Sequence, residues 1–144
     1  MSKKSLFLVI IQFSCLAYLI FTENFIVKGY LLVIQVIGVL TAVWGIGAMR
    51  IGNFNIQPEV KSNALFITKG PYKVIRNPMY FGLITFFGAM VLFDYKPINL
   101  FFYIILCIVL LIKIQMEEAF LKQRFGDVYI QYTKKSYRLI PLIF

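Results

Sequence analysis

Four long apolar runs dominate this chain of 144 residues and restrict what it can fold into. The runs cover residues 6–21, 30–49, 79–93 and 98–116. A helix that crosses a bilayer needs about 20 apolar residues, with roughly 17 as the lower limit. The second and fourth runs meet this length, the first nearly does, and the third is short on its own. With 60% hydrophobic residues, the chain is predicted to be an all-α integral membrane protein with about four transmembrane helices.

The third and fourth runs are separated by only a few residues. Residues 94–97 read Asp-Tyr-Lys-Pro, which is typical of a tight turn. We therefore predict that these two runs form a helical hairpin. The whole chain, 1–144, is expected to be one domain, with a motif-bearing core over about residues 57–141.

The basic residues predict the orientation in the membrane. Of the 15 Lys and Arg residues, all but Lys28 and Lys96 lie before the first run, between the second and third, or from the end of the fourth onward. Basic residues concentrate on the cytoplasmic side of membrane proteins. Both termini and the long middle loop are therefore predicted to be cytoplasmic, in a bacterial or archaeal cell membrane. The net charge of +9 reflects this topology and attraction to membrane lipids, so no nucleic-acid partner is predicted.

Several kinds of site are absent from the sequence. The chain has no histidine, which excludes imidazole acid–base catalysis and histidine metal ligation. Its two cysteines, Cys15 and Cys107, lie inside apolar runs, where a packing role is expected and no metal site is predicted. No glycine-rich phosphate fingerprint occurs, and the pair Gly45 and Gly47 within the second run is predicted to serve helix packing.

The segment before the third run combines turn formers with a helix start. Gly70 and Pro71 mark a turn, while Asn77 and Pro78 are typical of an N-cap and the first helical position. The start of a helix carries unpaired N–H groups and suits an anionic group. Gly82, about one turn further, would let another group approach the backbone closely. An ordinary capped helix is the competing interpretation.

Aromatic and apolar residues surround this corner. The apolar patch at residues 64–67 interrupts a polar loop and should fold back onto the protein or the membrane surface. Tyr72 and Tyr80 flank the corner and are either interfacial anchors or the floor of a site for an adenine ring and an anionic group.

Two adjacent acids lie where the fourth helix leaves the membrane. Acidic residues there are costly unless they are paired or functional. Glu118 stands four residues before Lys122, in the favourable order for an ion pair on the helix surface. Glu117 stands four residues after Lys113, so these two share a face. Gly126 is predicted to end the helix.

Together these motifs resemble the isoprenylcysteine carboxyl methyltransferase family and, more distantly, phospholipid methyltransferases. The resemblance covers about residues 57–141. The residues that carry it are Gly70-Pro71-Tyr72, the run Arg-Asn-Pro-Met-Tyr-Phe-Gly at 76–82, the run from Glu117 to Tyr132, and Arg138 with Pro141. Members of this family are multi-spanning membrane enzymes that use S-adenosylmethionine without a Rossmann domain.

The resemblance implies a set of site residues. The family's cofactor contacts fall on Gln57, Ala64, Leu65, Phe66, Ile67, Tyr72, Asn77, Pro78, Met79, Tyr80 and Glu117, and its substrate-contacting arginine falls on Lys113. Asn77 and Ala64 stand where the family has histidines. Lys113 lacks the bidentate contact that arginine makes to a carboxylate.

The predicted function is therefore S-adenosylmethionine-dependent methyl transfer to a lipophilic or membrane-embedded acceptor, which is a carboxylate, a thiol or an amine. A carboxylate or thiolate needs no general base, whereas an amine does, and Glu118 is the candidate. Two alternatives remain open. One is an NADPH-dependent membrane lipid reductase, although such enzymes are usually longer. The other is a small four-helix transporter or structural protein, for which Gln12 and Gln35 are the polar candidates within the first three runs.

Overall fold

The computed structural model describes residues 3–49 and 66–141. The regular elements among these residues are all helices, and the prediction of an all-α protein is confirmed. The helices are α1 (Lys3–Thr22), α2 (Tyr30–Ala48), the short 3-10 helix η1 (Gly70–Lys73), α3 (Pro78–Phe93) and α4 (Pro97–Thr133). Three predicted cofactor residues, Gln57, Ala64 and Leu65, lie outside the described residues.

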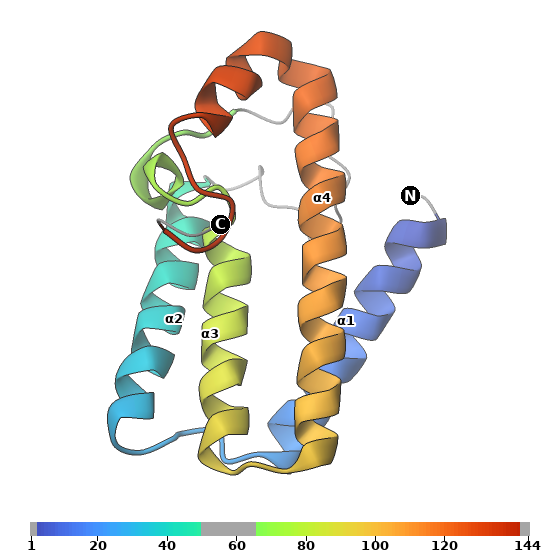
Figure 1. The fold of residues 1–144 in the computed structure, drawn as a ribbon, viewed down its shortest axis with the longest axis vertical. Helices are drawn as coiled ribbons and strands as arrows, with labels where there is room; N and C mark the ends of the chain where they lie inside the picture. Colours follow the sequence, from blue (N-terminus) through green and yellow to red (C-terminus); the bar gives the residue numbers. More distant parts are fainter. Residues whose placement is uncertain (1–2, 50–65, 142–144) are drawn as a thin grey trace.

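Three of these helices are long and apolar enough to cross a membrane: α1 with 20 residues, α2 with 19 and α4 with 37. The chain is therefore an integral membrane protein. Helix α3 has 16 residues, or about 24 Å of helix, and it is joined to α4 by the predicted tight turn. The two form an antiparallel hairpin, as Figure 1 shows.

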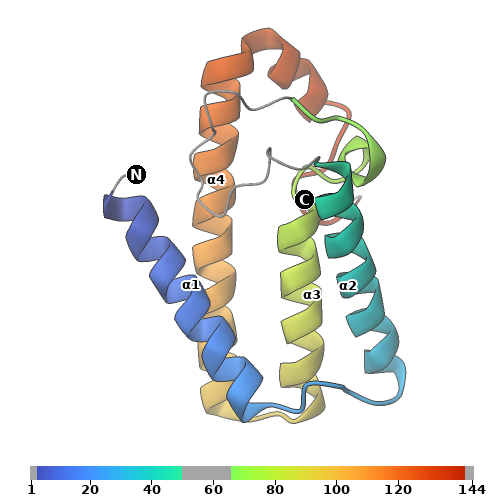
Figure 2. The same ribbon diagram turned by 180° about the vertical axis from the view of Figure 1, so that it is seen from behind.

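The helices pack in two pairs. Helix α2 packs along α3, and α1 packs against α4. The views in Figures 1 and 2 agree that α1 crosses α4 at a slant, while α2 runs beside α3. The connections after α1 and after α3 lie together at one end of the bundle, and the bent part of α4 lies at the other.

Glycines bring α2 and α3 into close contact. A Cβ atom added at Gly82 would lie 2.6 Å from both the Cβ of Ala42 and the backbone oxygen of Gly38. The group that approaches Gly82 is therefore a neighbouring helix. Gly45 lies against the start of α3, as its predicted packing role requires, whereas no described residue lies within 4 Å of a Cβ built at Gly47.

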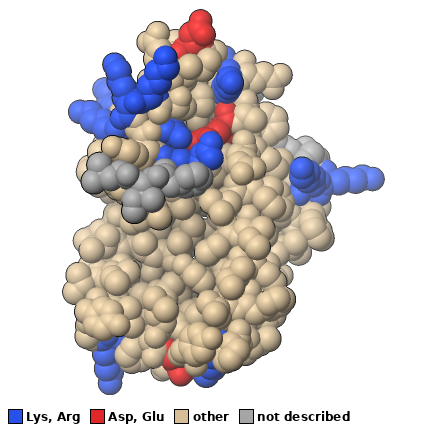
Figure 3. Space-filling model, in the orientation of Figure 1, with Lys and Arg blue, Asp and Glu red and all other residues tan. Residues whose placement is uncertain are grey.

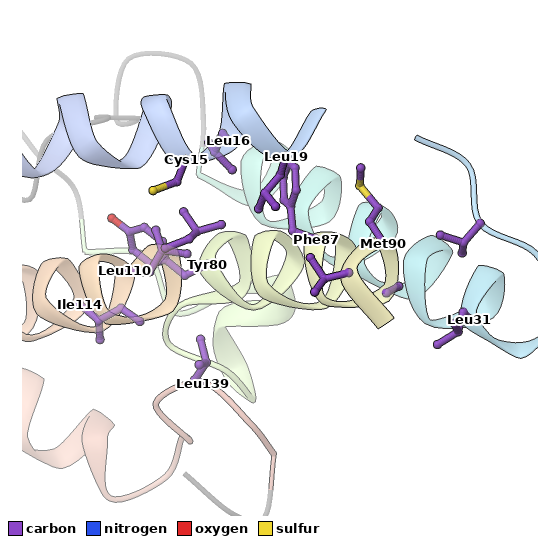
Figure 4. Close-up of a cluster of buried hydrophobic side chains, with 14 residues drawn as sticks. Cys15, Leu16, Leu19, Leu31, Tyr80, Phe87, Met90, Leu110, Ile114 and Leu139 are labelled. Atoms are coloured by element: carbon purple, nitrogen blue, oxygen red, sulfur yellow. The ribbon is translucent and has the colours of Figure 1, made fainter. Parts of the chain in front are cut away.

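The apolar core joins α1, α3 and α4. Leu19, Met90, Leu106 and Leu110 are fully buried in it, and Figure 4 shows side chains from these helices meeting. Cys15 is buried in the same cluster, which confirms its predicted packing role. Close van der Waals packing of these side chains holds together the helices that carry the site described below.

A buried polar cluster ties the helices together at the end opposite the bend. Asn99 of α4 donates a hydrogen bond to Glu23, just after α1, and accepts one of 3.1 Å from the Tyr18 hydroxyl. Gln35 of α2 is bonded to the backbone of the α1–α2 connection, donating to the Phe25 oxygen at 2.8 Å. Gln35 therefore has a structural partner, and buried polar groups need such partners.

Helix α4 changes direction at Gly126, where φ is 53° and ψ is −128°. This left-handed backbone favours glycine, and it confirms the predicted end of the straight helix. Figure 1 shows the chain folding over beyond this point and returning toward the start of α3. On the face shown in Figure 3, basic side chains gather toward the two ends of the molecule and leave an uncharged middle.

Candidate functional site

The C-terminal segment, residues 134–141, is tied by its backbone to the residues that precede α3. The Arg76 N–H donates to the Tyr137 oxygen, and the Tyr137 N–H donates to the Val74 oxygen, both at 2.8 Å. These bonds accompany an isolated parallel bridge between Ile75 and Tyr137. Two segments far apart in sequence therefore form one corner at the start of α3.

Helix α3 begins at this corner with Pro78 in its first turn, as predicted. The expected side-chain cap was wrong: Asn77 makes no hydrogen bond to the first N–H groups of α3. Its side-chain amide donates instead to the Arg138 oxygen at 2.8 Å. The amide thus holds the C-terminal segment in place. The first backbone N–H groups of α3 therefore have no side-chain cap.

Two other predicted cofactor residues lie in the interface between helices. Pro78 and Met79 lie against Gly45 of α2. Packing of α3 on α2 accounts for both side chains. Another predicted cofactor residue, Ile67, is partly buried.

A tyrosine and an acid connect α3 with α4. Tyr80 is buried, and its hydroxyl donates a hydrogen bond to Oε1 of Glu117. Tyr72 of η1 is also buried, but its hydroxyl has no hydrogen-bond partner among the described residues. Burial raises the pKa of the Tyr72 phenol, and the nearby Glu117 carboxylate raises it further. The structure therefore brings Tyr72, Tyr80 and Glu117 together.

A buried lysine extends this group toward the membrane interior. Lys113 is 1% exposed, and its ammonium donates a hydrogen bond of 2.6 Å to Oε1 of Gln12. The same ammonium lies 5.6 Å from the centroid of the Tyr80 ring, within the range of a cation–π contact. The site thus includes a residue of α1, Gln12. Sequence reasoning noted Gln12 as a polar residue in an apolar run but did not connect it with Lys113.

Glu118 lies between two arginines. Its Oε1 is 2.8 Å from Nε of Arg76, and its Oε2 is 2.8 Å from Nη2 of Arg138. The expected surface ion pair with Lys122 was wrong, because both carboxylate oxygens are occupied by guanidinium groups. Sequence reasoning missed Arg138 as a partner, although it belongs to the motif at the end of the chain. To act as a general base, Glu118 would have to give up one of these pairs.

The apolar patch in the middle loop folds back onto the protein, as predicted, where the structure describes it. The Phe66 ring stacks on Phe125 with centroids 5.0 Å apart and contacts Tyr129 and Tyr132 edge-on. The Tyr132 hydroxyl donates to the Tyr72 backbone oxygen at 2.6 Å. These aromatic contacts join the middle loop, η1 and the bent end of α4.

The sequence model of the phospholipid methyltransferase family matches residues 23–128 of this chain. The chain belongs to the phospholipid methyltransferase family. The predicted resemblance to membrane methyltransferases is thereby confirmed. The matched region includes Tyr72, Tyr80, Lys113 and Glu117, while Gln12 lies before it.

A relative is also known by sequence. This member of the phospholipid methyltransferase family is 38% identical over 80 residues to the protein-S-isoprenylcysteine O-methyltransferase of Schizosaccharomyces pombe. The similarity covers 55% of this chain and 34% of the yeast protein, so the chain spans about a third of the relative it matches. The yeast relative gives no support to the bacterial or archaeal origin expected from the sequence.

Proposed function

We propose that this member of the phospholipid methyltransferase family uses S-adenosylmethionine to methylate a lipophilic acceptor held in the membrane. The observation that carries the proposal is the connected group of Tyr80, Glu117 and Lys113. It lies where the apolar part of α4 ends, between the aqueous face and the bilayer. A water-soluble cofactor and a membrane acceptor can meet at such a level.

The residues of this group fit the chemistry of the cofactor. When bound, S-adenosylmethionine supplies a methyl group on a positively charged sulfonium. Among the described residues, the Glu117 carboxylate is hydrogen-bonded to a neutral tyrosine and to no arginine, so it can accept a bond from an ammonium group. The buried Tyr72 hydroxyl has a hydrogen bond to offer, since it has no partner in the described part of the chain. The uncapped start of α3 suits a carboxylate.

The chain's own contribution to such a transfer would be positioning. Methyl transfer is an in-line displacement, for which alignment of the two reactants supplies much of the rate enhancement. Tyr80 fixes one carboxylate oxygen of Glu117, and the two helices that carry these residues form one hairpin. Because α3 and α4 are joined by a short turn, the hydrogen bond between them keeps Tyr80 and Glu117 in a defined geometry.

Lys113 favours an anionic acceptor over an amine. A buried ammonium held by Gln12 attracts a carboxylate or thiolate and repels a protonated amine. Such acceptors need no general base, which agrees with the occupation of both Glu118 oxygens. The name of the yeast relative describes O-methylation of an S-isoprenylcysteine, and we propose an acceptor of this chemical class, with an apolar chain next to a carboxylate or thiolate.

The orientation proposed with this function has both termini in the cytoplasm. The site then faces the cytoplasmic supply of cofactor, and the acceptor arrives sideways from the bilayer. The distribution of the basic residues supports this orientation.

The experiment that tests the function has two steps. Calorimetry on the purified protein in detergent should show binding of S-adenosylmethionine and of its demethylated product, and none of NADPH. Methyl transfer should then be measured with three farnesyl probes: N-acetyl-S-farnesylcysteine, farnesyl thiol and farnesylamine. We expect methylation of the first or second and not of the third. Binding of NADPH alone would indicate a reductase, and binding of neither by folded protein would favour a non-enzymatic role.

A further inference from the structure

A separate pocket lies on another face of α4 from the one that carries Lys113 and Glu117. Its volume is about 570 Å³. Positions 115, 118 and 122 of α4 contribute to it, and this three-to-four-residue spacing places them on one side of the helix. The polar side chains in its lining are Arg76, Gln115, Glu118, Lys122, Tyr129, Thr133 and Arg138.

The charges of this lining are unbalanced. Arg76, Lys122 and Arg138 are positive and only Glu118 is negative, so the lining carries an excess of two positive charges. Glu118 forms ion pairs with both arginines and thereby aligns their side chains. The positive charge of Lys122 is then not balanced by any acid in the lining. Such a lining attracts an anion with up to two negative charges.

Hydrogen-bond donors in the pocket are also unsatisfied. Tyr129 is 3% exposed, yet its hydroxyl has no partner in the part of the chain that the structure describes. A buried hydroxyl without a partner costs free energy unless a ligand or water supplies one. Arg76 is held through Nη1 by the backbone oxygens of Thr133 and Ser136 and through Nε by Glu118. Its Nη2 takes no part in these bonds, so the guanidinium is fixed in place, and this nitrogen donates to no residue in the ranges 3–49 and 66–141.

The pocket lies where the apolar run of α4 ends, because Gln115 is one of the last residues of that run. Phospholipid phosphates lie at this level of a bilayer. We propose that the pocket binds a phosphate group, carried by a phospholipid headgroup or free in solution. Guanidinium, ammonium and phenol donors from separate segments match the several acceptor oxygens of a phosphate. This site differs in position and in ligand from the cofactor group around Glu117.

Two substitutions remove donors from the pocket without removing its arginines. Tyr129→Phe deletes only the hydroxyl, and since this hydroxyl bonds none of the described residues, thermal stability should be unchanged or raised. Lys122→Gln deletes an exposed charge. Each should weaken phosphate binding roughly tenfold, the loss of one charge-assisted contact. Lys135→Gln is the matched control, because it removes the same charge from an exposed lysine outside the pocket.

The two sources of phosphate are distinguished by the choice of probe. Native mass spectrometry in a neutral detergent should show retention of phosphatidylglycerol, and not of a diacylglycerol with the same acyl chains. Inorganic phosphate, added against chloride at matched ionic strength, should compete with the lipid if the source is the membrane. Binding of inorganic phosphate without retention of phosphatidylglycerol would identify free phosphate as the ligand.

Three results would overturn the proposal. One is equal retention of diacylglycerol and phosphatidylglycerol, which would mean binding through the acyl chains. Another is equal weakening by Lys122→Gln and Lys135→Gln, which would mean general surface charge. The third is binding of neither phosphate probe by folded wild-type protein. Affinity for the demethylated cofactor, measured on the same samples, shows separately whether the proposed methyltransferase function fails.

Discussion

The hydroxyl of Tyr80 donates a hydrogen bond to Oε1 of Glu117. This bond joins the first turn of α3 to the point where α4 leaves the apolar region. Through the Tyr80 ring it also connects Glu117 with the buried ammonium of Lys113. A single aromatic side chain of α3 therefore contacts both an acid and a lysine on the same face of α4.

Removal of this hydroxyl should weaken cofactor binding with little effect on the fold. Tyr80→Phe keeps the buried ring and loses one charge-assisted hydrogen bond, so affinity for the demethylated cofactor should fall roughly tenfold. Calorimetry measures the change. Tyr103→Phe is the control, because its hydroxyl donates to the Ile84 oxygen at 2.9 Å within the α3–α4 hairpin. A similar loss of affinity in both variants would show that the effect is general loosening of the hairpin.

The two adjacent acids should differ in what they affect. Glu117→Gln should reduce cofactor affinity roughly ten- to hundred-fold with the fold intact, since it removes one charge-assisted contact. Glu118→Gln should instead destabilise the protein by about 3 kcal/mol, because it leaves Arg76 and Arg138 without their shared acid. Thermal unfolding and calorimetry on both variants separate the two effects. Equal and small changes would show that the acid pair has neither role.

The helices could be predicted from the sequence because apolar run length and turn residues are local signals. The break at Gly126, the α3–α4 hairpin and the fold-back of Phe66 follow from such signals. The partners of polar side chains could not be predicted in this way. Glu118 pairs with Arg76 and Arg138, which are 42 and 20 residues away, and local spacing pointed to Lys122 instead.

Asn77 and Gln12 show the same difference between local and distant signals. The backbone start of α3 at Pro78 was predictable, but the Asn77 amide bonds a carbonyl 61 residues away. Gln12 was visible as a polar residue in an apolar run, and its partner Lys113 is 101 residues away. Only the tertiary packing of α1 on α4 reveals that the two form a pair.

Close packing of α2 on α3 should be sensitive to a single methyl group. Gly82→Ala places a Cβ 2.6 Å from Ala42 and Gly38, so the helices must separate, at a cost of about 1–3 kcal/mol. Thermal unfolding in detergent measures this loss. Gly47→Ala is the control, since none of the residues that the structure describes lies within 4 Å of its Cβ and alanine is the better helix former. We expect it to be neutral or slightly stabilising, and equal destabilisation by both would contradict the packing argument.

The orientation in the membrane can be tested with reporters at the two ends of the bundle. The turn between α3 and α4 lies at one end, with the connection after α1 beside it, and the bent end of α4 lies at the other (Figure 1). Lys28 and Lys96, the two basic residues set apart by the sequence, belong to those two connections. A reporter fused after Phe144 should therefore read as cytoplasmic, and one inserted at residues 94–97 should not. A reporter at residues 23–29 should agree with the latter, because both connections lie at the same end.

If reporters after Phe144 and at 94–97 fall on the same side, α4 does not cross the membrane, and the site around Glu117 would need a different route for its acceptor.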